Sequence, residues 1–488
     1  MAKQASAIQE PMAKVDTAWL RMESPTNLMM ITGVLMLDAP LLLKDLRELI
    51  ADRFLAYRRF GQKPVDTGAA AFWETVPKPD MRWHVRAAKL PRKAGKLALE
   101  KFVSELASTA LDHARPLWQF HLIENYQGGS VLVARIHHCY ADGLALVQVM
   151  LSLTDATPTA APRTEPAKSW LPRERGGVIA RLLAPARAGI SKAMTQGGAL
   201  MRNPALAATM AREGSEIARE LAIALNLADD PPTAFKAGAL GTRKRCAWAE
   251  PLPLAEVKAL GRVLRCTVND ILLACAAGAL RGYLRDLGES VDGVTIRATV
   301  PVNLRPLEHA KQLGNHFGLV FLDLPVGEAN PLRRLERVAA SMRELKRSKQ
   351  AALTFGLLAA VGMAPAALQR MALDLFSRKA TTVATNVPGP KKPLYLAGVE
   401  VKELMFWVPQ NGSVGMGVSI LSYNGRVHFG LIADQGRVAD PDAIAQRFAR
   451  EVEKLTLLTL MEDWDGGVAA DGAAATLLHY GADQLAAR

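Results

Sequence analysis

Apolar runs and amphipathic segments alternate along residues 15–150 in the way that is typical of mixed α/β proteins. Apolar runs bounded by polar residues predict strands, and apolar residues three or four positions apart predict helices. The pattern gives an apolar stretch at 29–37, helices at 42–53 and 96–111, and strands at 118–124 and 130–138.

A second mixed unit begins near residue 243. The pattern there predicts strands at 243–250, 295–302, 319–324, 414–423 and 427–433 and helices at 254–264, 268–287, 331–349 and 441–458. Asn424-Gly425 lies between the last two strands, and because both residue types tolerate positive φ, the pair predicts a tight hairpin. We therefore expect an α/β fold of the α+β type, with mixed sheets.

The stretch between the two units has a different composition. It begins with residues rich in Pro, Thr and Ala and continues with Arg-rich and Ala-rich segments of helical type. The end of the chain is rich in Gly and Ala, which indicates weak order. We expect an N-terminal lobe at 1–153, a partly flexible and partly helical connector at 154–235, a C-terminal lobe at 236–464 and a weakly ordered tail at 465–488.

One apolar segment, residues 351–368, contains no charged residue and has basic residues on both sides. A membrane span needs about 20 strongly apolar residues. This segment is rich in Ala and Gly and is interrupted by Thr354 and Pro365. We therefore expect a buried or interfacial helix here instead of a span.

Composition and charge narrow the possible partners and the compartment. The 488 residues include 60 Lys and Arg against 47 Asp and Glu, a formal charge of +13 that favours polyanions, phosphorylated small molecules or an anionic membrane surface. The four cysteines lack the paired spacing of zinc sites or disulfide scaffolds, so a reducing cytoplasm is expected. The first residues lack the apolar core of a signal peptide.

The predicted strand at 130–138 ends in the sequence His137-His138-Cys139-Tyr140-Ala141-Asp142-Gly143. Alternation along a strand places His137 and His138 on opposite faces. Asp142 is the expected N-cap of a helix that follows, and the positive end of that helix disfavours imidazolium, so a nearby histidine can stay neutral and act as a general base. A single buried histidine is more often a core residue, but the combined pattern occurs by chance in roughly one chain in a thousand of this length.

Other chemistries are less well supported by the same residues. Adjacent strand residues face apart and the remaining histidines form no i, i+4 set, which disfavours a metal site. The sequence has no Gly-x-Ser-x-Gly elbow, no Walker loop and no dinucleotide fingerprint. Cys139 has no identifiable cation to stabilise a thiolate, so we interpret it as a packing residue.

The stretch at 137–143 resembles the His-His-x-x-x-Asp-Gly signature of the CoA-dependent acyltransferase superfamily, which includes chloramphenicol acetyltransferase, carnitine acyltransferases and peptide-synthetase condensation domains. Further segments between about residues 15 and 458 resemble bacterial wax ester synthase/diacylglycerol acyltransferases. These segments are Pro116-Leu117-Trp118, Val268-Asn269-Asp270, Pro301-Val302-Asn303-Leu304-Arg305, Leu313-Gly314-Asn315, Thr385-Asn386-Val387-Pro388-Gly389-Pro390 and Ser422-Tyr423-Asn424-Gly425.

This resemblance implies two chloramphenicol-acetyltransferase-like lobes with a central channel, joined by a crossover. It implies transfer of a long-chain acyl group from acyl-CoA, a co-substrate, to a fatty alcohol or diacylglycerol, with no bound cofactor, no metal and no covalent intermediate. His138 would be the general base, a role worth typically 10² to 10⁴ in rate. His137 would support it, and Asp142, before Gly143, would shape the turn by pairing with an arginine such as Arg305.

The remaining motif residues have structural interpretations beside a role in the channel. Asn269 and Asp270 fit the first turn of a helix capped by Thr267. Trp118 fits a core position, and Asn386 fits either a turn or a donor that faces the channel. The chain departs from the family at Phe235-Lys236, where members often carry Leu-Asn.

The positive charge of the connector and of residues 333–349 could attract CoA phosphates or anionic lipid. We therefore expect a cytoplasmic protein that associates peripherally with the inner membrane face or with lipid inclusions. Three alternatives stay open: an acyltransferase or condensation-type enzyme that uses a carrier-protein thioester or another acceptor, a lipid-surface protein that binds acyl-CoA without turnover, and a nucleic-acid binder. The sequence contains no known nucleic-acid-recognition motif, which disfavours the last alternative.

Overall fold

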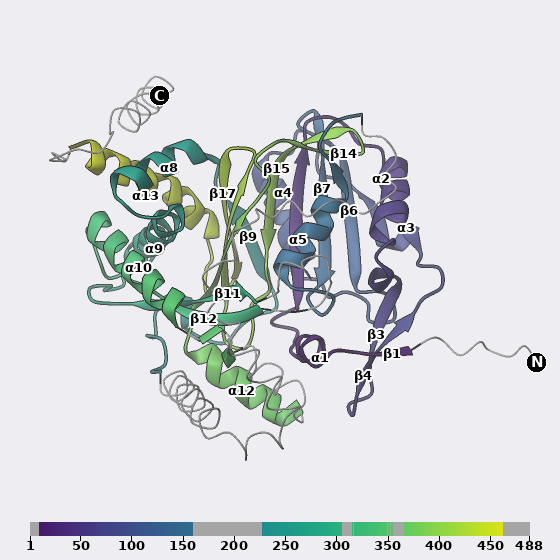
Figure 1. Cartoon of the computed structure of the whole chain (residues 1–488), viewed down its shortest axis with the longest axis horizontal. Helices are drawn as coiled ribbons and strands as arrows, with labels where there is room; N and C mark the ends of the chain where they lie inside the picture. Colours follow the sequence, from purple (N-terminus) through teal and green to yellow (C-terminus); the bar gives the residue numbers. More distant parts are fainter. Residues whose placement is uncertain are drawn as a thin grey trace, which may run out of the picture.

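Two seven-stranded sheets lie side by side and form the centre of the protein (Figure 1). The computed structural model describes residues 9–159, 227–304, 315, 317–348, 350–351, 353–354 and 366–461. The first sheet contains, in order, β5 (Val85–Ala88), β6 (Trp118–Tyr126), β7 (Gly129–His137), β2 (Met30–Leu37), β15 (Val399–Trp407), β14 (Leu394–Leu396) and β8 (Thr154–Asp155). The observed architecture confirms the predicted mixed α/β class.

The second sheet is also mixed. Its order is β10 (Leu252–Pro253), β17 (Arg426–Asp434), β16 (Met416–Tyr423), β13 (Thr382–Pro388), β11 (Ile296–Asn303) and β12 (Phe317–Leu324), and β9 (Lys244–Trp248) also pairs with β17. Asn424 and Gly425 have φ of 47° and 74° between β16 and β17, so the predicted hairpin is confirmed. A small third sheet contains β1 (Gln9–Pro11), β4 (Ala71–Thr75) and β3 (Gln62–Asp66).

The helices predicted from the hydrophobic pattern are present, whereas those at Lys14–Arg21, Met81–His84 and Ala366–Arg378 were not predicted. The helices are α1 (Lys14–Arg21), α2 (Leu43–Leu49), α3 (Met81–His84), α4 (Lys96–Ala107), α5 (Gly143–Ser152), α8 (Leu254–Val263), α9 (Val268–Asp286), α10 (Pro331–Arg347), α12 (Ala366–Arg378) and α13 (Pro441–Met461). Thr267 and Asp270 form a reciprocal capping box at the start of α9, which confirms the predicted cap. The predicted helix at 42–53 is α2 followed by a π-helical turn, Ile50–Phe54.

Two strand pairings were not foreseen from the sequence. β15 and β14 come from the part of the chain assigned to the C-terminal lobe, but β15 pairs antiparallel with β2, with Phe406 opposite Gly33, and β14 pairs with β8. Residues 394–407 therefore complete the first sheet. A buried cluster that includes Trp248 and Trp407 lies where the two sheets meet, with ring centroids 5.7 Å apart.

Several predictions fall outside the described residues. They concern most of the connector at 154–235, the centre of the apolar segment at 351–368, Arg305 and the tail at 465–488. Within the described part of the chain, no single helix is long and apolar enough to cross a bilayer, although α8 and α9, bent by 102°, meet that criterion as a pair.

Candidate active site

The end of β7 and the start of α5 form the predicted strand, turn and helix. β7 lies between β6 and β2, with His137 opposite Met30, and the backbone N–H of His138 donates to Met29 O at 2.7 Å. Asp142 caps α5, because its Oδ1 accepts a hydrogen bond of 2.8 Å from Ala145 N. The turn that carries His138 is therefore held from both sides.

His138 faces a cavity between the two sheets. It is 4% exposed and lines this cavity together with residues of both sheets, among them Thr299 of β11 and Phe406 of β15. Its imidazole stacks on Trp19 with ring centroids 4.2 Å apart, and Phe317 lies at 5.7 Å. Burial, with a smaller contribution from the neighbouring His137, lowers the pKa of His138 to about 3, so the ring is neutral at pH 7. From the sequence we expected the helix dipole to keep the His138 ring neutral, whereas burial is the larger cause.

His137 points away from this cavity, as the alternation of the strand predicts. Its Nδ1 accepts from Cys139 N at 3.1 Å, so its proton lies on Nε2, which is 3.6 Å from Glu23 Oε2. The same oxygen accepts from His113 Nε2 at 2.7 Å. Burial alone would raise the pKa of Glu23, but the hydrogen bond from His113 and the proximity of His137 outweigh it and lower that pKa to about 2. Burial lowers the pKa of His137.

Asn315 joins the turn to α1. Its Nδ2 donates to Asp16 Oδ1 at 2.8 Å and to the backbone oxygen of His138 at 3.0 Å, and its N–H also donates to Asp16. Burial raises the pKa of Asp16 to about 6, although the hydrogen bonds from Asn315 oppose this shift. Asn315 therefore fixes the backbone of His138 instead of lining the cavity.

Four further predicted site residues line the cavity with His138. These are Asp142, Gly143, Asn303 and Asn386. Asn386 Nδ2 donates to Asn269 Oδ1 at 2.7 Å, so Asn269, in the first turn of α9, orients the amide in the cavity wall. Asp270 forms part of the capping box at the start of α9.

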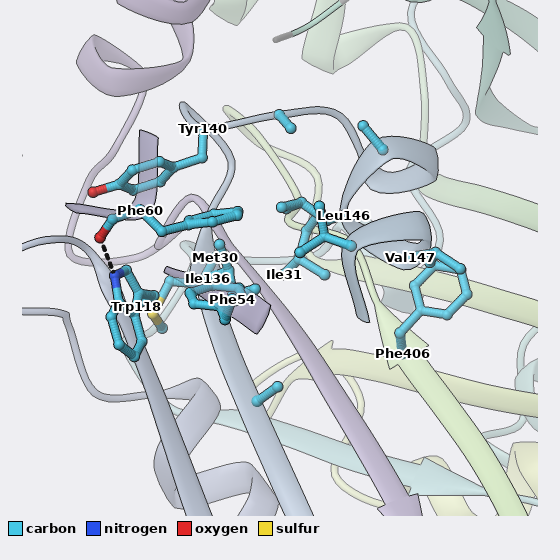
Figure 2. Packing of buried hydrophobic residues seen from close by; sticks show 14 of the residues in the cluster. Met30, Ile31, Phe54, Phe60, Trp118, Ile136, Tyr140, Leu146, Val147 and Phe406 are labelled. Carbon is cyan, nitrogen blue, oxygen red and sulfur yellow. Dashed lines mark hydrogen bonds between the residues drawn. The ribbon is translucent and has the colours of Figure 1, made fainter. Parts of the chain in front are cut away.

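The Pro116-Leu117-Trp118 motif lies behind the turn and not in the cavity. The indole of Trp118 is fully buried and donates to Phe60 O at 2.8 Å (Figure 2). It also stacks on His84, with ring centroids 4.0 Å apart. Tyr140 accepts from Leu117 N at 2.9 Å and donates to Gln62 O at 2.7 Å. The motif therefore packs against the end of the strand and does not contribute to the cavity lining. The predicted pairing of Asp142 with Arg305 lies outside the described residues.

Sequence reasoning missed several residues that surround the histidines. Trp19, Asp16 and Glu23 come from α1 or directly after it, and Phe317 begins β12. No motif had marked these positions, because only the fold brings them to the turn. Burial raises the pKa of the Cys139 thiol well above its ordinary value, which agrees with its interpretation as a packing residue. Within the described part of the chain, no group of three or more His, Cys, Asp or Glu is arranged to hold a metal ion.

Comparisons with known proteins agree with this architecture. The family model for the wax ester synthase/diacylglycerol acyltransferase catalytic domain matches residues 12–272, and the model for the WS/DGAT C-terminal domain matches residues 313–456. A probable diacylglycerol O-acyltransferase of Mycobacterium tuberculosis is 30% identical over 424 residues, which are 84% of this chain and 87% of that protein. A putative one of Mycobacterium bovis is 28% identical over 470 residues, 92% and 91% of the two chains.

Solved structures share the fold. The wax ester synthase/diacylglycerol acyltransferase from Marinobacter aquaeolei VT8 aligns with a TM-score of 0.67 at 20% identity, covering 92% of this chain and 99% of that one. The first condensation domain of the calcium-dependent antibiotic synthetase aligns with a TM-score of 0.57 at 15% identity, covering 93% and 97%.

Proposed function

The chain belongs to the wax ester synthase/diacylglycerol acyltransferase family and is an acyltransferase. On that premise we propose that it transfers a long-chain acyl group from acyl-CoA to a lipid hydroxyl, with His138 as the general base. His138 takes the hydroxyl proton as the oxygen attacks the thioester carbonyl. When the C–S bond breaks, the proton passes to the CoA sulfur. The observation that carries the proposal is the single neutral imidazole of His138 in the wall of the cavity between the sheets.

Direct transfer without an acyl-enzyme fits the chemistry of the turn. Cys139 is fully buried and its thiol pKa is raised well above the ordinary value, so it does not supply a thiolate. The acceptor oxygen is therefore the attacking nucleophile, and the base needs only to reach its proton.

The imidazolium that forms during attack needs stabilisation in a buried site. Nδ1 of His138 is buried and has no hydrogen-bond partner among the described residues. The indole face of Trp19 stacks on the ring, and a cation over an indole is stabilised by about 0.5–2 kcal/mol. Trp19 is therefore a positioning residue for the base, together with Asn315, His137 and Asp142.

The acceptor is a fatty alcohol, giving a wax ester, or a diacylglycerol, giving a triacylglycerol. The names of the mycobacterial relatives support the second, and the name of the Marinobacter enzyme supports both. Arg333, Arg343 and Lys346 are exposed on α10 and supply positive charge for peripheral association with an anionic membrane or a lipid inclusion.

The test is CoA release from palmitoyl-CoA by the purified protein with hexadecanol, dipalmitoylglycerol or no acceptor. The proposal predicts acceptor-dependent release that is lost in a folded His138→Ala protein, and the better alcohol identifies the acceptor. A carrier-protein donor is assayed in parallel. Release with that donor and none with palmitoyl-CoA would favour the condensation-type alternative.

A further inference from the structure

Asp16 is a buried carboxyl group close to the turn that carries His138, and no step of the proposed reaction uses it. It is 7% exposed and lies in the first turn of α1, three positions before Trp19. Residues three positions apart share one face of a helix, so Asp16 and Trp19 both face this turn. The helix therefore reaches His138 in two ways: the indole of Trp19 stacks on the ring, and Asp16 is joined to the backbone through Asn315.

The hydrogen bonds of Asn315 require an acceptor at Asp16. A backbone oxygen only accepts, so the amide atom that faces His138 O at 3.0 Å is the donor Nδ2. Nδ2 and the backbone N–H of Asn315 both donate to Asp16 Oδ1, at 2.8 and 3.2 Å. An oxygen that accepts two N–H groups suits a carboxylate, and a charged acceptor makes such bonds about twice as strong as neutral ones.

A proton on Asp16 opposes this arrangement. The protonated carboxyl group has an O–H donor, and Oδ1 of Asn315 is a buried acceptor that has no hydrogen-bond partner among the described residues. Rotation of the amide would bring Oδ1 to the donor, but it would also place Oδ1 against His138 O, where two acceptors repel each other. Protonation therefore releases the backbone of His138, and a displacement of about 1 Å in a catalytic group can cost roughly 10²-fold in rate.

The surroundings of Asp16 set the pH at which this proton binds. Burial raises the pKa of Asp16 to about 6, although the hydrogen bonds from Asn315 oppose the shift. Among the neighbouring charges, Arg59 lowers this pKa and Asp142 raises it. The adjacent thiol of Cys139 has a pKa raised well above its ordinary value, so it stays neutral near pH 6.

We propose that Asp16 is a positioning residue for the base: its carboxylate orients the amide of Asn315, which holds the backbone of His138, and turnover requires this carboxylate to be ionised. The inference rests on the proposed function, because it assigns a control to the general base of that reaction. The pKa of His138 is about 3, so the base alone would keep kcat constant above pH 5. Protonation of Asp16 instead makes kcat fall as the pH drops through about 6.

The ionised form of Asp16 lowers the stability of the fold. Its pKa is about 6 in the fold and 3.8 in the unfolded chain, so its contribution to stability is largest below pH 3.8 and is lost as the pH rises from 3.8 to about 6. Asp16→Asn removes the charge and, like the protonated carboxyl group, brings both a donor and an acceptor. At pH 7.5 this variant should melt no lower than wild type and yet be less active, which a purely structural role does not predict.

The test is kcat for CoA release between pH 5 and 8. Wild-type kcat should be about tenfold lower at pH 5 than at pH 7.5, as a single ionisation near pH 6 requires. Asp16→Asn should be slower than wild type at pH 7.5 by about tenfold or more and independent of pH over this range. Glu100→Gln is the matched control, because burial raises the pKa of Glu100 to about 7 but its carboxyl accepts from Trp248 N, where α4 meets β9. This control should keep the fall near pH 6.

A fall near pH 6 that persists in folded Asp16→Asn would overturn the proposal, as would an Asp16→Asn protein that matches wild-type kcat at pH 7.5. Asn315→Ala keeps the carboxylate and removes its connection to His138. It should show the same loss of rate and of pH dependence, which keeps the test valid if Asp16→Asn does not fold.

The connection between Asp16 and His138 is also read without turnover. In NMR spectra of protein labelled at histidine Cε1, the His138 signal, assigned by its absence in His138→Ala, should shift with a midpoint near pH 6. The shift should be missing in Asp16→Asn and Asn315→Ala. A shift in a protein that releases no CoA with any alcohol would contradict the proposed function and retain the connection, whereas turnover without the shift would overturn the connection alone.

Discussion

His137 and His138 are adjacent, buried and neutral, but their surroundings differ completely. His138 faces the cavity between the sheets and stacks on Trp19, while its Nδ1 has no hydrogen-bond partner among the described residues. His137 accepts from Cys139 N and faces Glu23 at 3.6 Å. The alternation of one strand thus gives two identical side chains different chemistry: one is open to a reactant, and the other is used to hold the turn.

If this contrast is correct, His137→Ala should damage the fold more than the chemistry. The change leaves the buried Cys139 N–H without its acceptor, and such a loss costs about 1–3 kcal/mol. Urea unfolding of the variant should show this lower stability, while kcat of the remaining folded protein falls by less than tenfold. A kcat loss as large as that of His138→Ala, at unchanged stability, would contradict the different roles assigned to His137 and His138.

The other side of the contrast is tested at Trp19. Removing the indole face in Trp19→Leu should lower kcat by about 2-fold to 30-fold, the equivalent of 0.5–2 kcal/mol, because the imidazolium loses its stacking partner. KM should change little, since the effect arises during proton transfer. Trp19→Phe keeps an aromatic face and should recover part of the loss. A raised KM with constant kcat would instead mean that Trp19 only shapes the cavity.

A third test is the pH dependence of stability on the side of His137. The pKa of Glu23 is about 2 in the fold and 4.5 in the unfolded chain, so its ionised form stabilises the protein above pH 4.5, and this contribution is lost as the pH falls from 4.5 towards 2. Wild type should be more stable than Glu23→Gln at pH 7, and the difference should shrink across that window. A difference that is independent of pH would show that the carboxylate charge does not matter.

The sequence predicted the elements well because their signals are local. The cap at Asp142, the capping box at Thr267 and the hairpin at Asn424 each depend on residues within a few positions of one another. The candidate base was reached by the spacing of a short motif. These features need no knowledge of the rest of the chain.

The surroundings of the base could not be predicted, because they depend on long-range contacts. Asn315 reaches Asp16 across 299 positions, and β15 joins β2 from the other end of the chain. For Pro116-Leu117-Trp118 the sequence left a channel role and a packing role open, and the buried position of Trp118 behind the turn agrees with packing. Trp19 carries no motif, because it matters only for the ring that it contacts.

The measurement that tests the central claim most directly is the single-turnover rate of CoA release in His138→Ala, with the preferred alcohol in excess. The account predicts a rate lower than wild type by 10² to 10⁴, with the melting temperature and acyl-CoA binding retained. A folded, acyl-CoA-binding His138→Ala protein that turns over within tenfold of wild type would contradict the assignment of His138 as the base.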